Sequence, residues 1–189
     1  HYLVVKNKGD FVSDQICYWD LAAVAKNGCL QTQTNSALLA DELDELIQDA
    51  VGLRMSADVP LGALLSGGYD SSLVVAMMQA QSSQRVKTFS IGFQESNFNE
   101  AQHAKEIARY LETDHTELYV TPEAALDVIP KLPIIYDEPF ADSSAIPTTL
   151  VSRFARQHVA VALSADGGDE VFYGYTAYAQ LGRRLAWLS

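Results

Sequence analysis

Two glycine turns in this 189-residue sequence are each followed by an aspartate that could take part in phosphate chemistry. The first runs from Ser66 to Ser72 (Ser-Gly-Gly-Tyr-Asp-Ser-Ser), and the second runs from Ser164 to Asp169 (Ser-Ala-Asp-Gly-Gly-Asp). Glycines let an anion approach the backbone, and a turn that enters a helix offers free N–H groups at the positive end of the helix dipole. Serine hydroxyls add further donors. The pattern indicates a phosphate site.

Asp70 distinguishes the first turn from the Walker-type phosphate loop, which has a lysine after its last glycine. A carboxylate beside a phosphate is repulsive unless a cation lies between them, so Asp70 predicts a hard divalent metal such as Mg²⁺. Asp169, in the second turn, is its expected partner because a shared cation relieves the repulsion between two carboxylates. The alternative is that Asp70 is only a helix cap, and that Asp169 and Glu170 are first-turn acids favoured by the dipole.

The elements around these turns alternate between strand and helix. Strands are expected at residues 61–65, 86–93, 116–120 and 158–163, with the first and the last of them buried, and the intervening segments have helical character. This alternation predicts an α/β fold with a doubly wound parallel sheet. Ligands of such sheets bind outside the carboxyl ends of the strands, near the switch point, and both glycine turns lie at strand carboxyl ends. We therefore expect the two turns to meet.

The N-terminal part of the chain is the least regular. Residues 1–35 are expected to form an interdomain segment with two short strands, 1–5 and 14–19, and a linker over 22–34. Residues 36–189 are expected to form the main domain, beginning with a helix over 36–55. The sequence starts without methionine, which indicates a piece of a longer protein.

Composition excludes several classes of function. A formal net charge of −11 argues against a nucleic-acid partner, whose phosphates need a basic patch. The apolar runs are too short for a membrane span, and no N-terminal signal pattern is visible. Cys17 and Cys29 lack metal-ligand or redox spacing and fit a reducing cytoplasm, so a cytoplasmic location is expected.

Four sequence blocks carry a family resemblance. The first turn, between a strand and a helix, resembles the pyrophosphate loop of the N-type ATP pyrophosphatases, which implies a Rossmann-like fold of the adenine nucleotide alpha hydrolase type. Together with residues 88–93, 137–147 and 163–175 it resembles, in order, the synthetase domain of glutamine-hydrolysing asparagine synthetases. The tripeptide Tyr18-Trp19-Asp20 is similar to the segment that joins this family's glutaminase and synthetase domains.

The resemblance implies a ligase that uses ATP and Mg²⁺ to convert aspartate into asparagine. The β-carboxylate would attack the α-phosphate of ATP to give β-aspartyl-AMP, and ammonia from glutamine would displace AMP. A homodimer of the full-length protein is a further expectation. Residue by residue, it implies pyrophosphate binding by Ser66, Gly67, Gly68, Ser71 and Ser72, and Mg²⁺ binding by Asp70 and Asp169. It also implies nucleotide contacts from Leu64, Ile91, Ser164 and Ala165, with Asp166 managing the amine nucleophile.

The sequence departs from the family pattern at several places. The second turn has Ala165 where the family usually has glycine and Asp166 where glutamate is common, and Tyr173-Gly174 replaces a glycine pair. The glutaminase domain, with its N-terminal cysteine, is absent, as is the later part of the synthetase domain with its pyrophosphate-binding lysine. We therefore expect a C-terminally truncated domain whose 189 residues do not make asparagine from glutamine by themselves.

Two other functions remain open on the sequence alone. One is another amide-forming ligase of the same superfamily, similar to a β-lactam synthetase, with a different acceptor acid. Residues 137–147 are expected to shape the acceptor pocket, and one sequence does not decode it. The other is a nucleotide-binding module without catalysis, favoured by the extra methyl group of Ala165.

Overall fold

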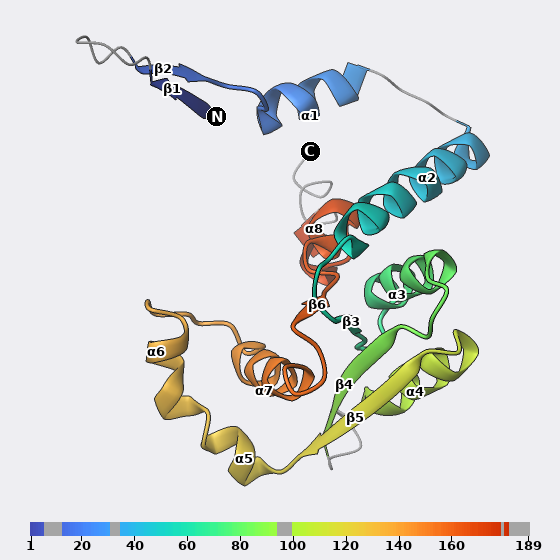
Figure 1. The fold of residues 1–189 in the computed structure, drawn as a ribbon. Helices are drawn as coiled ribbons and strands as arrows, with labels where there is room; N and C mark the ends of the chain where they lie inside the picture. The colour runs from blue at the N-terminus through green and yellow to red at the C-terminus, as the bar shows by residue number, and fades with distance from the viewer. Residues whose placement is uncertain (6–12, 31–34, 94–99, 179, 182–189) are drawn as a thin grey trace. The chain divides into compact units, whose positions relative to one another are not determined.

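A computed structural model describes residues 1–5, 13–30, 35–93, 100–178, 180 and 181 (Figure 1). The chain divides into two compact units, residues 1–45 and 46–189. The boundary between these units lies inside helix α2 (Ser36–Met55), whose limits agree with those predicted from the sequence.

The first unit contains a β-hairpin and a helix. Strand β1 (Tyr2–Val5) pairs antiparallel with β2 (Ser13–Ile16), so the second strand is shorter than predicted. Helix α1 (Leu21–Leu30) replaces the predicted linker, and that prediction was wrong. The overlooked signal is Asp20, whose Oδ1 accepts a hydrogen bond from the Ala23 N–H at 2.8 Å. An aspartate in this position is a strong N-cap.

The second unit is built on a four-stranded parallel sheet. Its strands are β3 (Leu61–Leu64), β4 (Lys87–Phe93), β5 (Asp114–Val120) and β6 (Val161–Leu163), in the order β5-β4-β3-β6. The chain runs outward from β3 to β5 and then returns to the other side of β3. The switch point therefore lies between β3 and β6.

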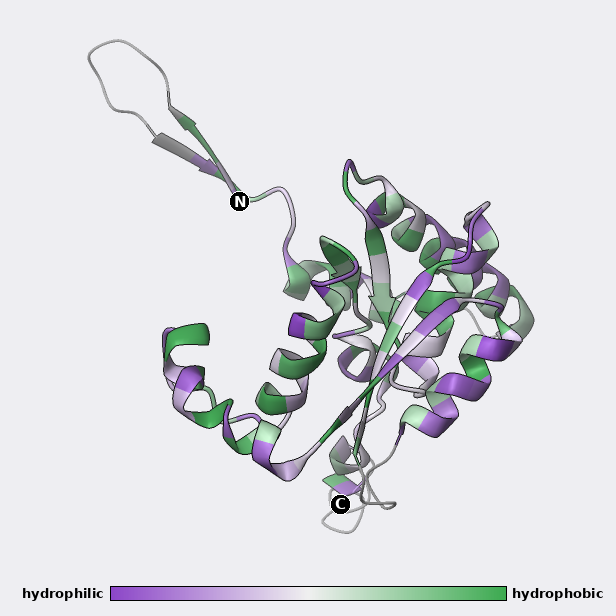
Figure 2. Cartoon of the chain, turned by 60° about the horizontal axis from the view of Figure 1, so that its bottom comes forward, coloured by the Kyte–Doolittle hydropathy of each residue, from purple (hydrophilic) through white to green (hydrophobic). Residues whose placement is uncertain are grey.

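Helices cover both faces of this sheet, which confirms the doubly wound fold (Figure 1). Helices α3 (Tyr69–Gln81) and α4 (Ala101–Tyr110) pack on one face with the second half of α2, and the core there includes Val51, Leu65, Val75, Met78 and Ala104. Helix α7 (Ala145–Ala155) packs on the other face, where the core includes Phe89, Val151, Ala155 and Val159. Helix α4 shows most clearly the alternation of hydrophobic and hydrophilic residues that is expected when one side of a helix faces a sheet (Figure 2).

Short helices connect β5 to α7. Helix α5 (Pro122–Leu126) begins after Thr121, whose Oγ1 accepts a hydrogen bond from the Ala124 N–H at 3.3 Å. The 3₁₀ helix η2 (Ile129–Lys131) and helix α6 (Leu132–Ile135) each carry a proline in the first turn. The prolines thus divide this segment into short helices. A further short helix, α8 (Gly168–Phe172), follows β6.

Two boundaries differ from the predictions in ways that affect the site. Helix α7 begins at Ala145, inside the segment 137–147 that was expected to shape the acceptor pocket. Strand β6 is an edge strand of three residues with Val161 43% exposed, rather than a buried strand from residue 158. The N–H groups of His158 and Val159 still bond to the Ala155 carbonyl at 2.9 Å, so α7 holds these residues out of the sheet.

None of the helices in the described residues is both long and apolar enough to cross a membrane.

Candidate active site

The first glycine turn leads directly into α3, and three backbone N–H groups there form no hydrogen bond within the described residues. Gly68 is the N-cap, so Tyr69, Asp70 and Ser71 form the first helical turn, and no side chain caps it. The Ser72 N–H is the first to bond back, to the Gly68 carbonyl at 3.1 Å. Helix geometry leaves the three preceding N–H groups without intrahelical partners. Asp70 is therefore a first-turn residue, and its alternative role as the cap is wrong.

Serine hydroxyls hold this turn together from within. The Ser66 and Ser71 hydroxyls are 2.9 Å apart, and the Ser66 N–H donates to Ser71 Oγ at 3.2 Å. The Ser72 hydroxyl donates to the Gly68 carbonyl at 2.6 Å. Ser71 is only 8% exposed, so its hydroxyl acts mainly as an internal brace of the turn.

Gly67 lets the turn approach α4 closely. Its φ is +88°, a left-handed conformation that side chains with a Cβ rarely adopt. A Cβ at this position would also lie 3.0 Å from the backbone nitrogen of Ala104 and 3.1 Å from the Cβ of His103. The position therefore requires glycine on two independent grounds.

The two glycine turns meet, as the switch-point argument predicts. The side chain of Asp70 lies against Gly168 in the second turn, where an added Cβ would collide with the carboxylate. The carboxylate of Asp169 lies in the same way against Gly174. Both aspartates line a single cavity at the carboxyl ends of β3 and β6.

This cavity, of about 840 Å³, lies within the second unit. It is lined by ten of the twelve site residues predicted from the sequence: Leu64, Ser66, Gly68, Asp70, Ser71, Ile91, Ser164, Ala165, Asp166 and Asp169. Gly67 and Ser72 do not line it, because Gly67 packs on α4 and the Ser72 hydroxyl bonds back to Gly68.

The cavity has an apolar wall and an acidic end. Leu64, Ile91 and Val151 contribute to the apolar wall, which suits a flat ring. The carboxylates of Asp70, Asp166 and Asp169 come from the two turns. Asp166 is held by a hydrogen bond from the Ser164 hydroxyl to its Oδ2, at 2.8 Å.

Several residues of the cavity lining were not predicted from the sequence. They include Tyr69, Glu100, Ser144, Thr148 and Phe172. Ser144 is the N-cap of α7 and Thr148 lies in its first turns, so the start of this helix brings both residues to the cavity. Within the segment 137–147, which was expected to shape the acceptor pocket, the acids Asp137, Glu138 and Asp142 do not line the cavity. Asp142 instead accepts a hydrogen bond from the Ser144 N–H at 2.7 Å.

The two aspartates fit a magnesium ion that is shared with a phosphate group. Mg²⁺ usually takes one or two carboxylates and fills its remaining positions with phosphate oxygens and water. Asp70 and Asp169 offer this minimal set beside the open N–H groups of α3. The described residues hold no cluster of three potential metal ligands, so a cage made by the protein alone does not form there.

Comparison with known proteins identifies the family. The sequence model of the asparagine synthase family matches residues 42–189, most of the chain. The chain belongs to the asparagine synthase family. This confirms the resemblance predicted from the four sequence blocks.

Its relatives named as asparagine synthetases are much longer than this chain. It is 40% identical over 148 residues to asparagine synthetase [glutamine-hydrolyzing] 1 of Bacillus subtilis, which covers 78% of this chain and 23% of the relative. It is 46% identical over 141 residues to a putative asparagine synthetase of Methanocaldococcus jannaschii, covering 74% of this chain and 27% of the relative. The chain thus spans about a quarter of the length of these relatives.

Solved structures with a similar arrangement include an NH3-dependent NAD synthetase from Campylobacter jejuni. The TM-score is 0.47 at 15% sequence identity, over 71% of this chain and 60% of that one.

Next to the cavity, Tyr175 forms a hydrogen bond with Glu170 of α8. The Tyr175 hydroxyl donates to Glu170 Oε1 at 2.7 Å. This bond to the carboxylate raises the pKa of Tyr175 to about 12 and lowers the pKa of Glu170. The two residues stay joined as phenol and carboxylate at neutral pH.

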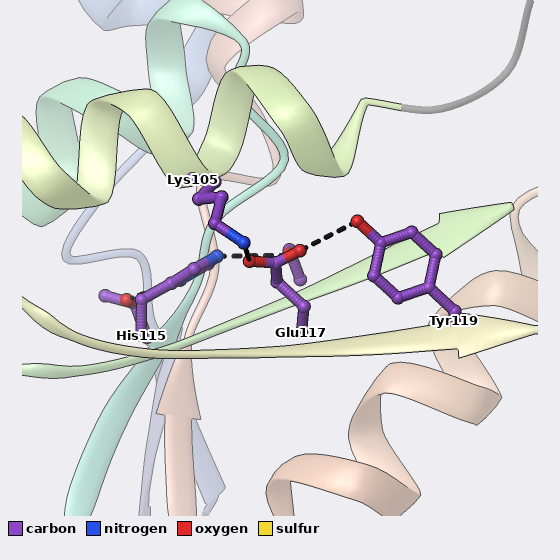
Figure 3. Close-up of polar contacts among 6 residues, drawn as sticks. Lys105, His115, Glu117 and Tyr119 are labelled. Carbon is purple, nitrogen blue, oxygen red and sulfur yellow. Dashed lines mark hydrogen bonds and ion pairs between the residues drawn. The ribbon is translucent and has the colours of Figure 1, made fainter. Parts of the chain in front are cut away.

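A second polar cluster lies between β4, β5 and α4 (Figure 3). Of its described residues, Ser90 lines the cavity. His115 on β5 bonds to Thr88 Oγ1 through Nδ1 at 2.9 Å and to Ser90 Oγ through Nε2 at 3.2 Å. Burial lowers the pKa of His115, although the nearby Glu117 carboxylate opposes this shift.

Glu117 connects this cluster to α4. It accepts the Lys105 ammonium at 2.8 Å and the Tyr119 hydroxyl at 2.8 Å (Figure 3). Burial raises the pKa of Glu117, but the hydrogen bonds from Lys105 and Tyr119, with the Lys105 charge, outweigh burial and leave this pKa lowered.

Acidification below about pH 6.5 is expected to destabilise the domain through His115. Its pKa is lower in the folded chain than the ordinary 6.5, so the unfolded chain binds a proton first. The stabilising contribution is complete above pH 6.5 and is lost as the pH falls below it. Urea unfolding at pH 7.5 and 5.5 measures this change.

Two substitutions separate His115 from other acid-sensitive groups. His115→Gln should flatten the pH dependence of the free energy of unfolding, because an amide can hydrogen-bond without titrating. His103→Gln, at an exposed position on α4, should leave it as in the wild type. Equal pH dependence in both variants would contradict a role for His115.

Proposed function

We propose that this chain forms the nucleotide-binding part of an asparagine synthetase. In the whole protein, the β-carboxylate of aspartate would attack the α-phosphate of ATP to give β-aspartyl-AMP and release pyrophosphate. Ammonia released from glutamine would then displace AMP to give asparagine. The observation that carries this proposal is the meeting of two glycine turns at one cavity, with Asp70 against Gly168 and an apolar wall nearby. Relatives named as asparagine synthetases support the choice of substrates.

The first turn is suited to hold pyrophosphate. The open N–H groups of Tyr69, Asp70 and Ser71 face developing negative charge at the positive end of a 13-residue helix. Ser66, Gly68 and Ser71 line this part of the cavity, while Gly67 and Ser72 shape the turn that presents them. Preorganised donors of this kind stabilise phosphoryl transition states because they need no reorganisation.

Leu64 and Ile91 supply the wall expected to frame the adenosine, with Ser164 and Ala165 beside it. Asp70 and Asp169 would hold Mg²⁺, which neutralises charge on the phosphates. Asp166 would accept the proton that leaves the attacking nitrogen, and the Ser164 hydrogen bond orients its carboxylate for this step. A cytoplasmic location and a homodimer of the full-length protein are part of the same proposal.

Aspartate-dependent exchange between ATP and pyrophosphate in the full-length protein tests this function. Exchange requires adenylation to be reversible and does not require ammonia, so it isolates the step assigned to this cavity. A panel of carboxylic acids should give exchange with aspartate above all others. Exchange with another acid only would indicate a different amide-forming ligase, and no exchange with any acid would favour a non-catalytic nucleotide-binding module.

A further inference from the structure

Asp169 is held by the chain that follows α8. This helix has only five residues and ends at Phe172, and the next residue, Tyr173, turns the chain back with a φ of +62°. The Gly174 N–H then donates to the Asp169 carbonyl at 3.0 Å, and the Asp169 carboxylate packs on the Gly174 backbone. The orientation of this carboxylate therefore depends on where the turn at Gly174 lies.

Tyr175 fastens this turn to the helix. Its hydroxyl donates to Glu170 Oε1 at 2.7 Å. Tyr175 follows Gly174 in the chain and Glu170 follows Asp169, so this hydrogen bond holds the turn against the helix. The ring of Tyr178 lies 5.4 Å from that of Tyr175 in an edge-on arrangement, and the Tyr178 carbonyl accepts the Tyr173 hydroxyl at 2.9 Å. A helix this short has little stability of its own, so these contacts fix its position.

We propose that Tyr175 is a positioning residue for Asp169, acting through its hydrogen bond to Glu170 and the turn at Gly174. Tyr175 does not line the cavity, whereas Asp169 and Gly174 do. A hydroxyl outside the site would thus set the affinity of the Asp70–Asp169 pair for Mg²⁺ with bound nucleotide. This inference rests on the proposed nucleotide function and extends it to residues beyond the cavity.

The test is a Mg²⁺ titration of the full-length enzyme at fixed ATP, followed by the rise in unfolding temperature. Tyr175→Phe removes one hydroxyl and keeps the ring. Loss of one hydrogen bond to a carboxylate should raise the Mg²⁺ concentration for half of the shift by about five-fold or more. Tyr178→Phe is the matched control, because it removes a neighbouring hydroxyl that forms no hydrogen bond within the described residues.

The outcomes separate this inference from the proposed function. A wild-type enzyme that shows no Mg²⁺-dependent shift with ATP overturns both. A wild-type shift with equal Mg²⁺ requirements in Tyr175→Phe and Tyr178→Phe overturns the role of Tyr175 alone. Unfolding temperatures without ligand show whether either variant is misfolded. If Tyr175→Phe is misfolded, a second pair of variants tests the same hydrogen bond. Glu170→Gln keeps an acceptor for the Tyr175 hydroxyl, so it should retain more of the Mg²⁺ response than Glu170→Ala. Equal Mg²⁺ responses in these two variants would refute the inference.

Discussion

Replacing Asp70 with asparagine is expected to lower aspartate-dependent ATP–pyrophosphate exchange by about 10²–10³-fold in the full-length enzyme. The substitution keeps the size of the side chain and its contact with Gly168 but removes the charge that would bind Mg²⁺. The negative charges of the ATP phosphates and of Asp169 and Asp166 would then repel each other without a bound cation to neutralise them. The loss should persist at high Mg²⁺, since a neutral amide is a weak ligand for this ion.

Asp137→Asn provides a matched control for this prediction. Asp137 does not line the cavity, and its φ of +57° is one that asparagine tolerates well. The control should retain wild-type exchange. If Asp70→Asn also retained it, the assignment of Asp70 as a metal ligand would be wrong.

Replacing Gly67 with alanine should destabilise the fold by about 2 kcal/mol or more, because left-handed backbone and steric crowding both oppose a Cβ there. The crowded neighbour is the backbone of Ala104, which α4 cannot easily move. For a domain of this size the unfolding temperature should fall by roughly 4–8 °C. Thermal unfolding followed by circular dichroism measures the effect.

Gly68→Ala is the neighbouring comparison. Gly68 has φ −72° and ψ 166°, which alanine adopts freely, and its added Cβ would meet only Ser66 Oγ at 3.4 Å. Its stability should remain close to that of the wild type. A similar loss in both variants would show that the turn does not pack on α4 as described.

The fold could be predicted where the apolar pattern and turn residues of a segment agree with how that segment packs in the structure. Strands β3 and β4 are mostly apolar runs bounded by turn residues, so their composition indicates strands. Strand β5 begins two residues before the predicted start at residue 116, with the polar residues Asp114 and His115. Strand β6 was overpredicted because Val159 and Ala160 look equally apolar but remain bonded to the end of α7 and to Pro60. Helix α1 was not predicted, because residues 22–34 look like a linker and the N-cap Asp20 is the one clear helix signal before them.

Much of the candidate site followed from the rule that ligands bind at strand carboxyl ends. Both glycine turns and Ile91 belong to strand ends that the switch point brings together. Glu100 and Thr148 could not be predicted in this way, because they reach the cavity through the packing of α4 and α7. The contact of Asp169 with Gly174 depends on a left-handed residue at Tyr173, for which the sequence carries no local signal.

The most direct test of the central claim is unfolding of this 189-residue chain with and without Mg²⁺ and ATP. If the meeting glycine turns form a magnesium–nucleotide site, ligand at a hundred times its dissociation constant should stabilise the chain by about 2.7 kcal/mol. Chelation of Mg²⁺ by EDTA should remove most of this gain. An unchanged unfolding midpoint in a chain that is folded by circular dichroism would contradict the account.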